Sequence, residues 1–173
     1  MLIVICPGIH ADELNQGLIE ALPAELKWLL VPPAIPPYSP WHLHNFVAER
    51  CDRSQPLVFL GFSAGVVGAI GAARQWQSQA GNVRTLIACD GWGVPLFAGF
   101  PTHRLSHDYF THWSSQLLGG SQESFYAEPA VNHLHLWSHP RDVKGWQLNG
   151  SERHYTTAAN YLNLLLQHYH REA

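Results

Sequence analysis

The sequence predicts an α/β fold: a three-layer α/β/α sandwich with a mainly parallel sheet of five or six strands. Two observations support this prediction. Short apolar runs alternate with segments of helical periodicity, as in chains built from successive strand–helix units. One of these runs, Leu57–Leu60, is apolar at every position, which is typical of a strand that helices cover on both sides. The length of 173 residues corresponds to one domain, which we expect to span 1–173.

The first half of the chain contains two predicted strands and two predicted helices. A strand is expected at Leu2–Cys6, where a Pro-Gly pair ends it, and apolar residues then recur at helical spacing from 14 to 22. A second, short strand is expected at Trp28–Val31, ahead of a proline-rich run. Ser39 and Pro40 mark the start of the next helix, because a hydroxyl caps the first turn and proline fits its first position.

The second half continues the same alternation. The Leu57–Leu60 strand leads into a helix of small residues, Val66–Gln77, whose glycines and alanines allow close packing on the sheet. A fourth strand is expected at Val83–Cys89 and a fifth at Leu134–Trp137. The last helix, Ala158–Tyr169, carries its leucines and tyrosines on one face, which indicates a core-facing helix.

Residues 90–132, between the fourth and fifth predicted strands, form an expected aromatic-rich insert. Such a length predicts one or two helices within it. Its aromatic rings suit either a lid with an acyl-binding pocket or a subdomain that packs its own small core. Eight aromatic residues fall in this insert: Trp92, Phe97, Phe100, Tyr109, Phe110, Trp113, Phe125 and Tyr126.

The composition excludes several classes of function. The formal net charge is −3 and the chain has no cluster of lysine and arginine, so we expect no nucleic-acid partner. No apolar stretch is long enough for a membrane span. Three cysteines cannot pair evenly, which favours a reducing compartment, and we expect a cytoplasmic protein.

Histidine spacing raises the question of a metal site. His133 and His135 alternate, while His103, His107 and His112 are spaced much like one helical face. The chain has neither a His-Glu-x-x-His motif nor a cysteine pair, and dispersed histidines are common on surfaces and in hydrogen-bonded cores. We therefore expect no metal and no other cofactor.

The strongest chemical signal is Gly61-Phe62-Ser63-Ala64-Gly65, which fits the G-x-S-x-G pattern of a nucleophile elbow. In such an elbow a strand turns sharply into a helix, and the serine side chain stands clear of both. The flanking glycines remove Cβ atoms that would collide in so tight a turn. The helix that follows directs its first N–H groups toward the serine, where an oxyanion would develop.

A serine nucleophile needs a base, and the base needs an orienting carboxylate. In the chain order serine, acid, histidine, Asp142 follows the fifth predicted strand and His154 precedes the last helix. Two alternatives stay open. Asp90, at the end of the fourth strand, is a rival acid, and His139 is a rival base.

In its order of elements and in these motifs the chain resembles the α/β-hydrolase superfamily, and it is most similar to compact members such as cutinase-like serine hydrolases. The resemblance implies that Ser63 is the nucleophile, Asp142 the orienting acid and His154 the base. It also implies an oxyanion hole formed by the N–H groups of Ala64 and Ile9, with Gly8 as the alternative to Ile9.

The predicted function is therefore that of a serine hydrolase that cleaves a small or medium acyl ester or thioester through an acyl-enzyme, without a cofactor. Two other functions fit the same sequence. A hydrolase fold can bind a ligand or partner without catalysis. An aromatic insert can also dock a partner chain, for which an exposed apolar patch would be the mark.

Overall fold

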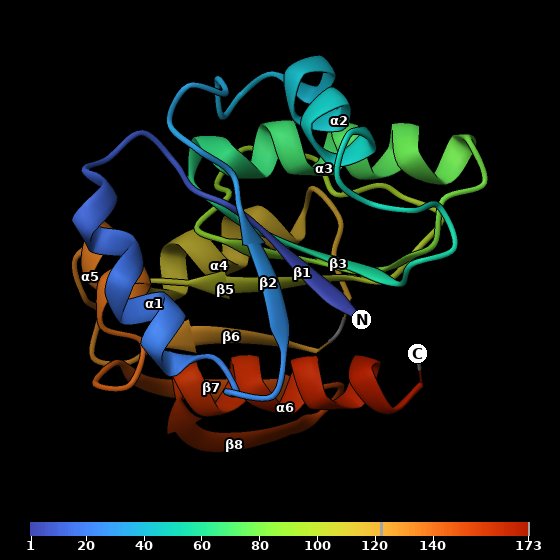
Figure 1. The fold of residues 1–173 in the computed structure, drawn as a ribbon. Coiled ribbons are helices and arrows are strands. Elements are labelled where there is room, and N and C mark those ends of the chain that lie inside the picture. Colours follow the sequence, from blue (N-terminus) through green and yellow to red (C-terminus); the bar gives the residue numbers. More distant parts are fainter. Residues whose placement is uncertain (122, 173) are drawn as a thin grey trace.

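A mixed sheet forms the centre of the molecule (Figure 1). The computed structural model describes residues 1–121 and 123–172, and within them eight strands follow the order β2-β1-β3-β4-β5-β6-β7-β8. The α/β class is thus confirmed. The strands are β1 (Leu2–Cys6), β2 (Lys27–Leu30), β3 (Leu57–Phe62), β4 (Val83–Cys89), β5 (Thr102–Ser106), β6 (Ser124–Ala127), β7 (Lys144–Asn149) and β8 (Glu152–Thr157).

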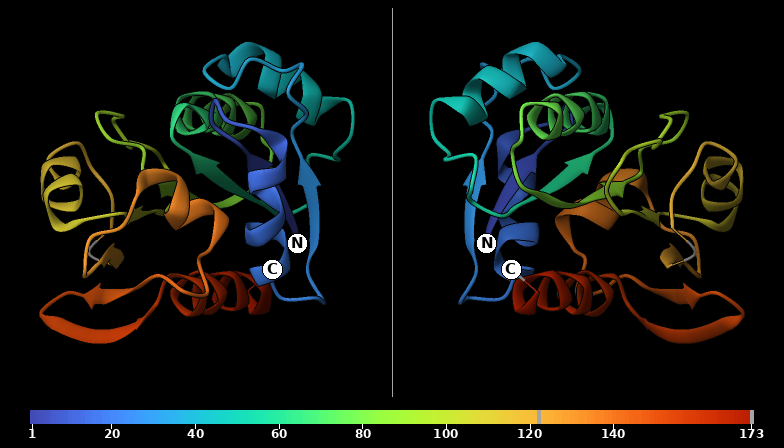
Figure 2. Two further views of the ribbon diagram at one scale, coloured as in Figure 1. Left: turned by 90° about the vertical axis from the view of Figure 1, so that its left-hand side faces the viewer. Right: turned by 90° about the vertical axis from the view of Figure 1, so that its right-hand side faces the viewer.

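Helices cover both faces of this sheet (Figures 1 and 2). Helices α2 and α3 pack on one face, and α1, α5 and α6 contribute to the apolar core of the other. None of the helices in the described residues is long and apolar enough to cross a membrane. The helices are α1 (Asn15–Ala21), α2 (Pro40–Ala48), α3 (Ala64–Ser78), α4 (Tyr109–Gln116), α5 (His133–Ser138) and α6 (Ala158–Arg171), and a 3₁₀ turn (Asp12–Leu14) precedes α1.

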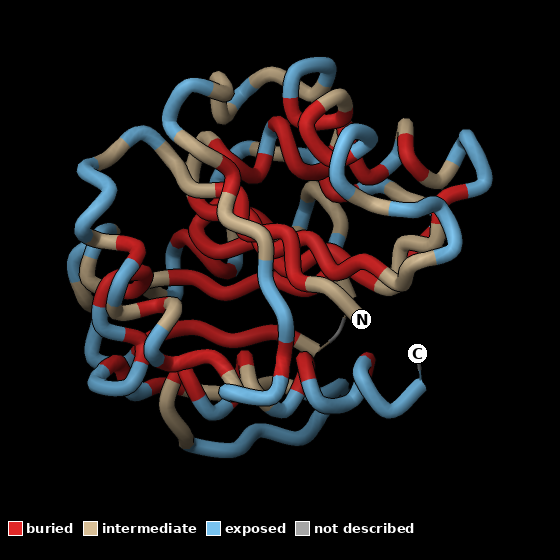
Figure 3. Tube along the Cα trace, viewed as in Figure 1, coloured by how far each residue is buried: buried red, intermediate tan, exposed pale blue. Residues whose placement is uncertain are grey.

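The sheet is larger than predicted and partly antiparallel. Strands β2, β1, β3, β4, β5 and β6 run parallel to one another, whereas β7 pairs antiparallel with β6 and forms an antiparallel hairpin with β8 at one edge. Burial decreases from the middle of the sheet to its edges. Every residue of β3 is buried, whereas the residues of the edge strands β2 and β8 are exposed or half-buried (Figure 3). The expectation of five or six strands was therefore too low.

Residues 90–132, predicted as an insert, contain β5, α4 and β6, and both strands belong to the main sheet. The segment Leu134–Trp137 is also different from the prediction, because it lies in helix α5 and not in a strand. The Asn132 side chain accepts a hydrogen bond from the N–H of Leu134 and so caps this helix. The alternation of histidine and leucine from 133 to 136 is typical of a strand. In the structure this segment is a helix that Asn132 caps and whose last three residues, Leu136–Ser138, are buried.

The topology brings three chain segments to one end of the sheet. Strands β3, β4 and β5 are adjacent and parallel, so their carboxyl ends lie side by side. Ser63 follows β3, Asp90 follows β4 and His107 follows β5. In open α/β sheets, ligands bind outside the carboxyl ends of the strands. The candidate site is therefore expected at this end of the sheet.

Candidate active site

Ser63 lies in a strained turn between β3 and α3. Its backbone has φ 51° and ψ −123°, a conformation that residues with a side chain rarely adopt. The Ser63 N–H donates to the carbonyl of Cys89 (2.9 Å), and the Ser63 carbonyl accepts from the N–H of Val66 (3.1 Å). Such strain costs on the order of 1–3 kcal/mol and persists where surrounding structure enforces it, often at functional sites. This is the geometry that the G-x-S-x-G pattern predicts.

The glycines around Ser63 are required because neighbouring atoms lie too close to leave room for a Cβ. A Cβ on Gly65 would lie 2.1 Å from the carbonyl oxygen of Cys6, and a Cβ on Gly61 would lie 3.0 Å from the Cα of Val66. Gly8 makes a similar approach, because a Cβ there would lie 2.9 Å from the Cβ of Ser63. The loop after β1 and the first turn of α3 thus enclose the serine from two sides.

Replacing Gly65 by alanine is expected to lower the free energy of unfolding by about 3 kcal/mol, because the new methyl group meets backbone that cannot rotate away. Urea unfolding followed by circular dichroism measures this loss. Gly99→Ala is the matched control, because its Cβ would meet only the flexible end of Gln77, and we expect a change within about 0.5 kcal/mol. Equal stability of the two variants would contradict the packing described for the elbow.

Ser63 opens onto a pocket of about 480 Å³ at the carboxyl ends of the strands. One part of its wall is polar and includes Ser63, Asp90, His107 and His133. The other part is mainly apolar and comes from α3, α4 and the loop after β4. Its residues are Ala64, Val67, Trp92, Val94, Phe110 and Thr111. The pocket therefore combines a hydroxyl, two imidazoles and a carboxylate with an apolar surface.

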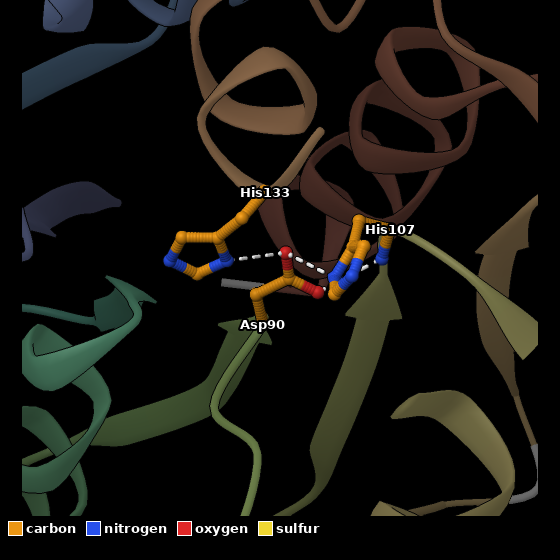
Figure 4. Close-up of side chains that lie close together, drawn as sticks. All are labelled: Asp90, His107 and His133. Carbon is orange, nitrogen blue, oxygen red and sulfur yellow. Dashed lines mark hydrogen bonds and ion pairs between the residues drawn. The ribbon is translucent and has the colours of Figure 1, made fainter. Parts of the chain in front are cut away.

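Asp90 is the buried charge of this pocket, with a side chain only 1% exposed. Its Oδ1 accepts from the His107 N–H (2.8 Å), and its Oδ2 accepts from Nδ1 of both His107 (2.9 Å) and His133 (2.8 Å) (Figure 4). Burial by itself raises the pKa of Asp90, but the hydrogen bonds from the two histidines outweigh it and hold the pKa below its usual value. The carboxylate is thus ionised and oriented.

Asp90 shares a backbone feature with Ser63. Its φ is 50°, and the described residues other than glycine with positive φ are Ser63, Ala80 and Asp90. Two of these three positions line the same pocket. Backbone strain clusters at sites where function requires a fixed side-chain direction, so this coincidence supports a functional pocket.

His133 is held by contacts on two sides. It is the first residue of α5, its Nδ1–H donates to Asp90, and its ring stacks on Phe62 with a centroid separation of 4.6 Å. In Figure 4 the second ring nitrogen, Nε2, points away from the carboxylate. Because Phe62 directly precedes Ser63 and both Ser63 and His133 line the pocket, this ring lies beside the elbow.

His107 is the second histidine on Asp90. Its Nε2 lies 3.2 Å from a carboxylate oxygen of Asp108, so the ring stands between two carboxylates. The hydrogen bond to Asp90 raises the pKa of His107, and partial burial opposes this effect. Together Asp90, His107 and His133 offer three metal-ligating atoms that all lie within 4.8 Å of one another.

The structure places the other predicted site residues elsewhere. Asp142 is exposed in the turn between α5 and β7, where its N–H donates to the carbonyl of His139. His154 is exposed on the edge strand β8, opposite Gln147. His139 is exposed and stacks on His135 with a centroid separation of 4.7 Å. None of these three side chains lines the pocket that contains Ser63.

The predicted oxyanion donors also divide between two places. Ala64 lines the pocket of Ser63, and Gly8 lies against Ser63 itself. Ile9 is 74% exposed and, with Gly8, lines a separate pocket of about 170 Å³ between the β1 loop and the proline-rich segment. Gly8 therefore has the closer contact with the serine.

His107 and His133 are the residues of this site that the sequence does not indicate as catalytic, whereas Asp90 is the rival acid that the sequence leaves open. A usable signal is the cap residue Asn132, which marks a helix start directly before His133.

Comparisons with known proteins add no assignment: no protein-family model matches the chain, and no match to a curated protein sequence is found.

Proposed function

We propose that the protein is a serine hydrolase of the α/β-hydrolase type that cleaves small or medium acyl esters or thioesters. Ser63 is the nucleophile, His133 the general base and Asp90 the orienting acid, in place of the His154 and Asp142 expected from chain order. The observation that supports this proposal best is that the strained Ser63 and the His133–Asp90 pair line one pocket.

The proposed mechanism follows from the two nitrogens of His133. With Nδ1–H donated to Asp90, the neutral ring carries a lone pair on Nε2. That nitrogen accepts the Ser63 proton as the serine oxygen bonds to the carbonyl carbon, and Asp90 stabilises the imidazolium that results. His133 then returns the proton to the departing alcohol or thiol. Water hydrolyses the acyl-enzyme by the same transfers.

Within the described residues the Ser63 hydroxyl has no hydrogen-bond partner. Catalytic hydrogen bonds often shorten only when substrate fills a site, so we expect Ser63 and Nε2 of His133 to approach each other in the complex. The oxyanion is proposed to bind the N–H of Ala64, at the start of α3, and the N–H of Gly8 or Ile9 in the loop after β1.

The pocket wall indicates the kind of substrate. Among the described residues neither lysine nor arginine lines it, while Val67, Trp92, Val94 and Phe110 present apolar surface. The indole N–H of Trp92 donates to the Ser114 hydroxyl (3.0 Å), which fixes this ring against α4. We therefore propose an uncharged, apolar acyl or leaving group, because an anionic group would meet the Asp90 carboxylate and no lysine or arginine among the described lining residues.

The proposed compartment is a reducing one such as the cytoplasm. Cys6, Cys51 and Cys89 are all free. Burial raises the pKa of the Cys6 and Cys89 thiols, which makes both poor nucleophiles. No thiol is therefore proposed to compete with Ser63 in the reaction.

A fluorophosphonate probe tests the proposal, because it reacts readily only with an activated serine. We expect stoichiometric labelling that mass spectrometry of peptides locates at Ser63, together with hydrolysis of p-nitrophenyl esters. A panel of esters and thioesters of graded chain length then measures the acyl preference. If the folded protein labels no faster than its heat-denatured form, the proposal is wrong and binding without catalysis explains the pocket better.

A further inference from the structure

The proposed hydrolase mechanism assigns no role to His107, the second histidine of the pocket. A catalytic triad needs one imidazole on its carboxylate, but Asp90 receives two. Nδ1 of His107 and Nδ1 of His133 both approach the same oxygen, Oδ2, at 2.9 and 2.8 Å (Figure 4). Three possible metal-ligating atoms, Oδ2 of Asp90 and Nδ1 of both histidines, thus lie within 4.8 Å of one another. They come from the end of β4, the residue after β5 and the start of α5.

These donors suit a zinc ion. Two imidazole nitrogens and one carboxylate oxygen are a common zinc ligand set, and they leave a fourth position open. With bonds of about 2.0–2.1 Å, tetrahedral ligand atoms lie about 3.3 Å apart. For an ion to enter between the three side chains, the Oδ2–Nδ1 separations of 2.8 and 2.9 Å need to open by about half an ångström. The two Nδ1 atoms, which lie within 4.8 Å of each other, need to reach the same spacing by rotation of the two rings.

The surroundings of the cluster support the same conclusion. Zinc-bound histidines usually direct their other nitrogen to a carboxylate, which fixes the ring, and Nε2 of His107 lies 3.2 Å from Oδ2 of Asp108. Asp90 is anchored through Oδ1 by the His107 N–H, which leaves Oδ2 for the ion. Asp90, His107 and His133 all line the pocket, and we expect the fourth position to face it.

We infer that Asp90, His107 and His133 form a zinc site, and that zinc in this site switches off the proposed serine chemistry. The reason is the tautomer of His133. Zinc on Nδ1 requires the neutral ring to carry its proton on Nε2, so this nitrogen can no longer accept the proton of Ser63. The switching part of the inference rests on the proposed function, whereas the zinc site does not.

The zinc site is tested on protein freed of metal with a chelator. Titration with ZnCl₂ by isothermal calorimetry is expected to show one ion per chain. His107→Ala is expected to weaken zinc binding at least a hundredfold, because it removes a ligand. Asp108→Asn keeps an oxygen to cap α4 and is expected to weaken binding about tenfold. If Asp108→Asn also weakens zinc binding, the weaker binding of His107→Ala is not a result of misfolding.

His139→Ala is the control for zinc held by surface histidines, because His139 stacks on His135 one helical turn away. We expect its zinc affinity to stay within about twofold of the natural protein's. Loss of affinity in His139→Ala, unchanged affinity in His107→Ala, or the absence of stoichiometric binding would each overturn the site.

Fluorophosphonate labelling tests the switch. We expect saturating ZnCl₂ to slow the labelling of Ser63 at least tenfold and EDTA to restore it, while labelling of His107→Ala does not respond to the same zinc concentration. Zinc binding without slower labelling would overturn the switch. Labelling without zinc binding would overturn the inference and leave the hydrolase intact. Zinc binding to a protein whose metal-free form does not label would overturn the proposed function and leave the zinc site.

Discussion

Replacing Ser63 by alanine is expected to lower the turnover of p-nitrophenyl butyrate by at least about a thousandfold, because the members of a triad act as a unit and the nucleophile cannot be replaced. Alanine adopts the backbone of the elbow no worse than serine, since both carry one Cβ and φ at this position is 51°. The variant should therefore keep its fold, and the loss should appear in kcat. Steady-state kinetics and thermal unfolding together separate the two effects.

Ser78→Ala is a suitable control for this measurement. Ser78 ends the same helix α3, on the side remote from the elbow, and its hydroxyl donates to the carbonyl of Gln75. We expect its turnover to stay within about twofold of the natural protein's. A loss below about tenfold in Ser63→Ala would contradict a mechanism in which this oxygen attacks the substrate.

Replacing Asp90 by asparagine is expected to have the second largest effect, a loss of activity of about a thousandfold to ten-thousandfold. Asparagine has nearly the same shape, but it carries no charge to stabilise the imidazolium of His133. Its amide also no longer selects the tautomer with the proton on Nδ1. Turnover of the same ester measures the loss.

Asp142→Asn separates the two candidate acids. Asp142 is exposed in a turn outside the pocket, so its variant should retain activity within about twofold. The reverse pattern, with Asp90→Asn active and Asp142→Asn inactive, would show that chain order identified the acid correctly and that the buried carboxylate has another role.

The sequence predicted the centre of the fold because its signal there is simple. Strands β1 and β3 are apolar runs, and β4 is apolar from Leu86 to Cys89, as the central strands of a sheet covered on both faces must be. The elbow was predictable for a similar reason, since the tight turn restricts Gly61 and Gly65 to a residue without Cβ. Local chemistry determines both features.

Strands β5 and β6 could not be predicted from the sequence, because their residues are not typical of buried strands. The sequence of β5, Thr102–Ser106, contains histidine and arginine, yet every residue in it is buried. Arg104 is only 2% exposed, and its guanidinium donates to the carbonyls of Gly119 (2.7 Å) and Val94 (2.8 Å). These partners lie in loops that only the folded structure brings to the arginine.

The choice of base depended on the same kind of long-range information. His133 and Ser63 are seventy positions apart in the sequence, and no local pattern shows that α5 carries His133 to the elbow. The place of His154 before the last helix suggests a base, but that segment is the edge strand β8 of a hairpin. Sequence position thus led to Ser63 as the proposed nucleophile and left Asp90 open as an acid, whereas the topology of the sheet was needed to propose His133 as the base.

The most direct test of the proposed catalytic unit compares fluorophosphonate labelling of Ser63 in His133→Ala and in His154→Ala. We predict that metal-free His133→Ala labels at least about a hundredfold more slowly than the natural protein, because its serine has lost the base that activates it. His154→Ala should label at a rate within about twofold of the natural one. Normal labelling of His133→Ala, with slow labelling of His154→Ala, would contradict the assignment of Ser63, His133 and Asp90 as one catalytic unit.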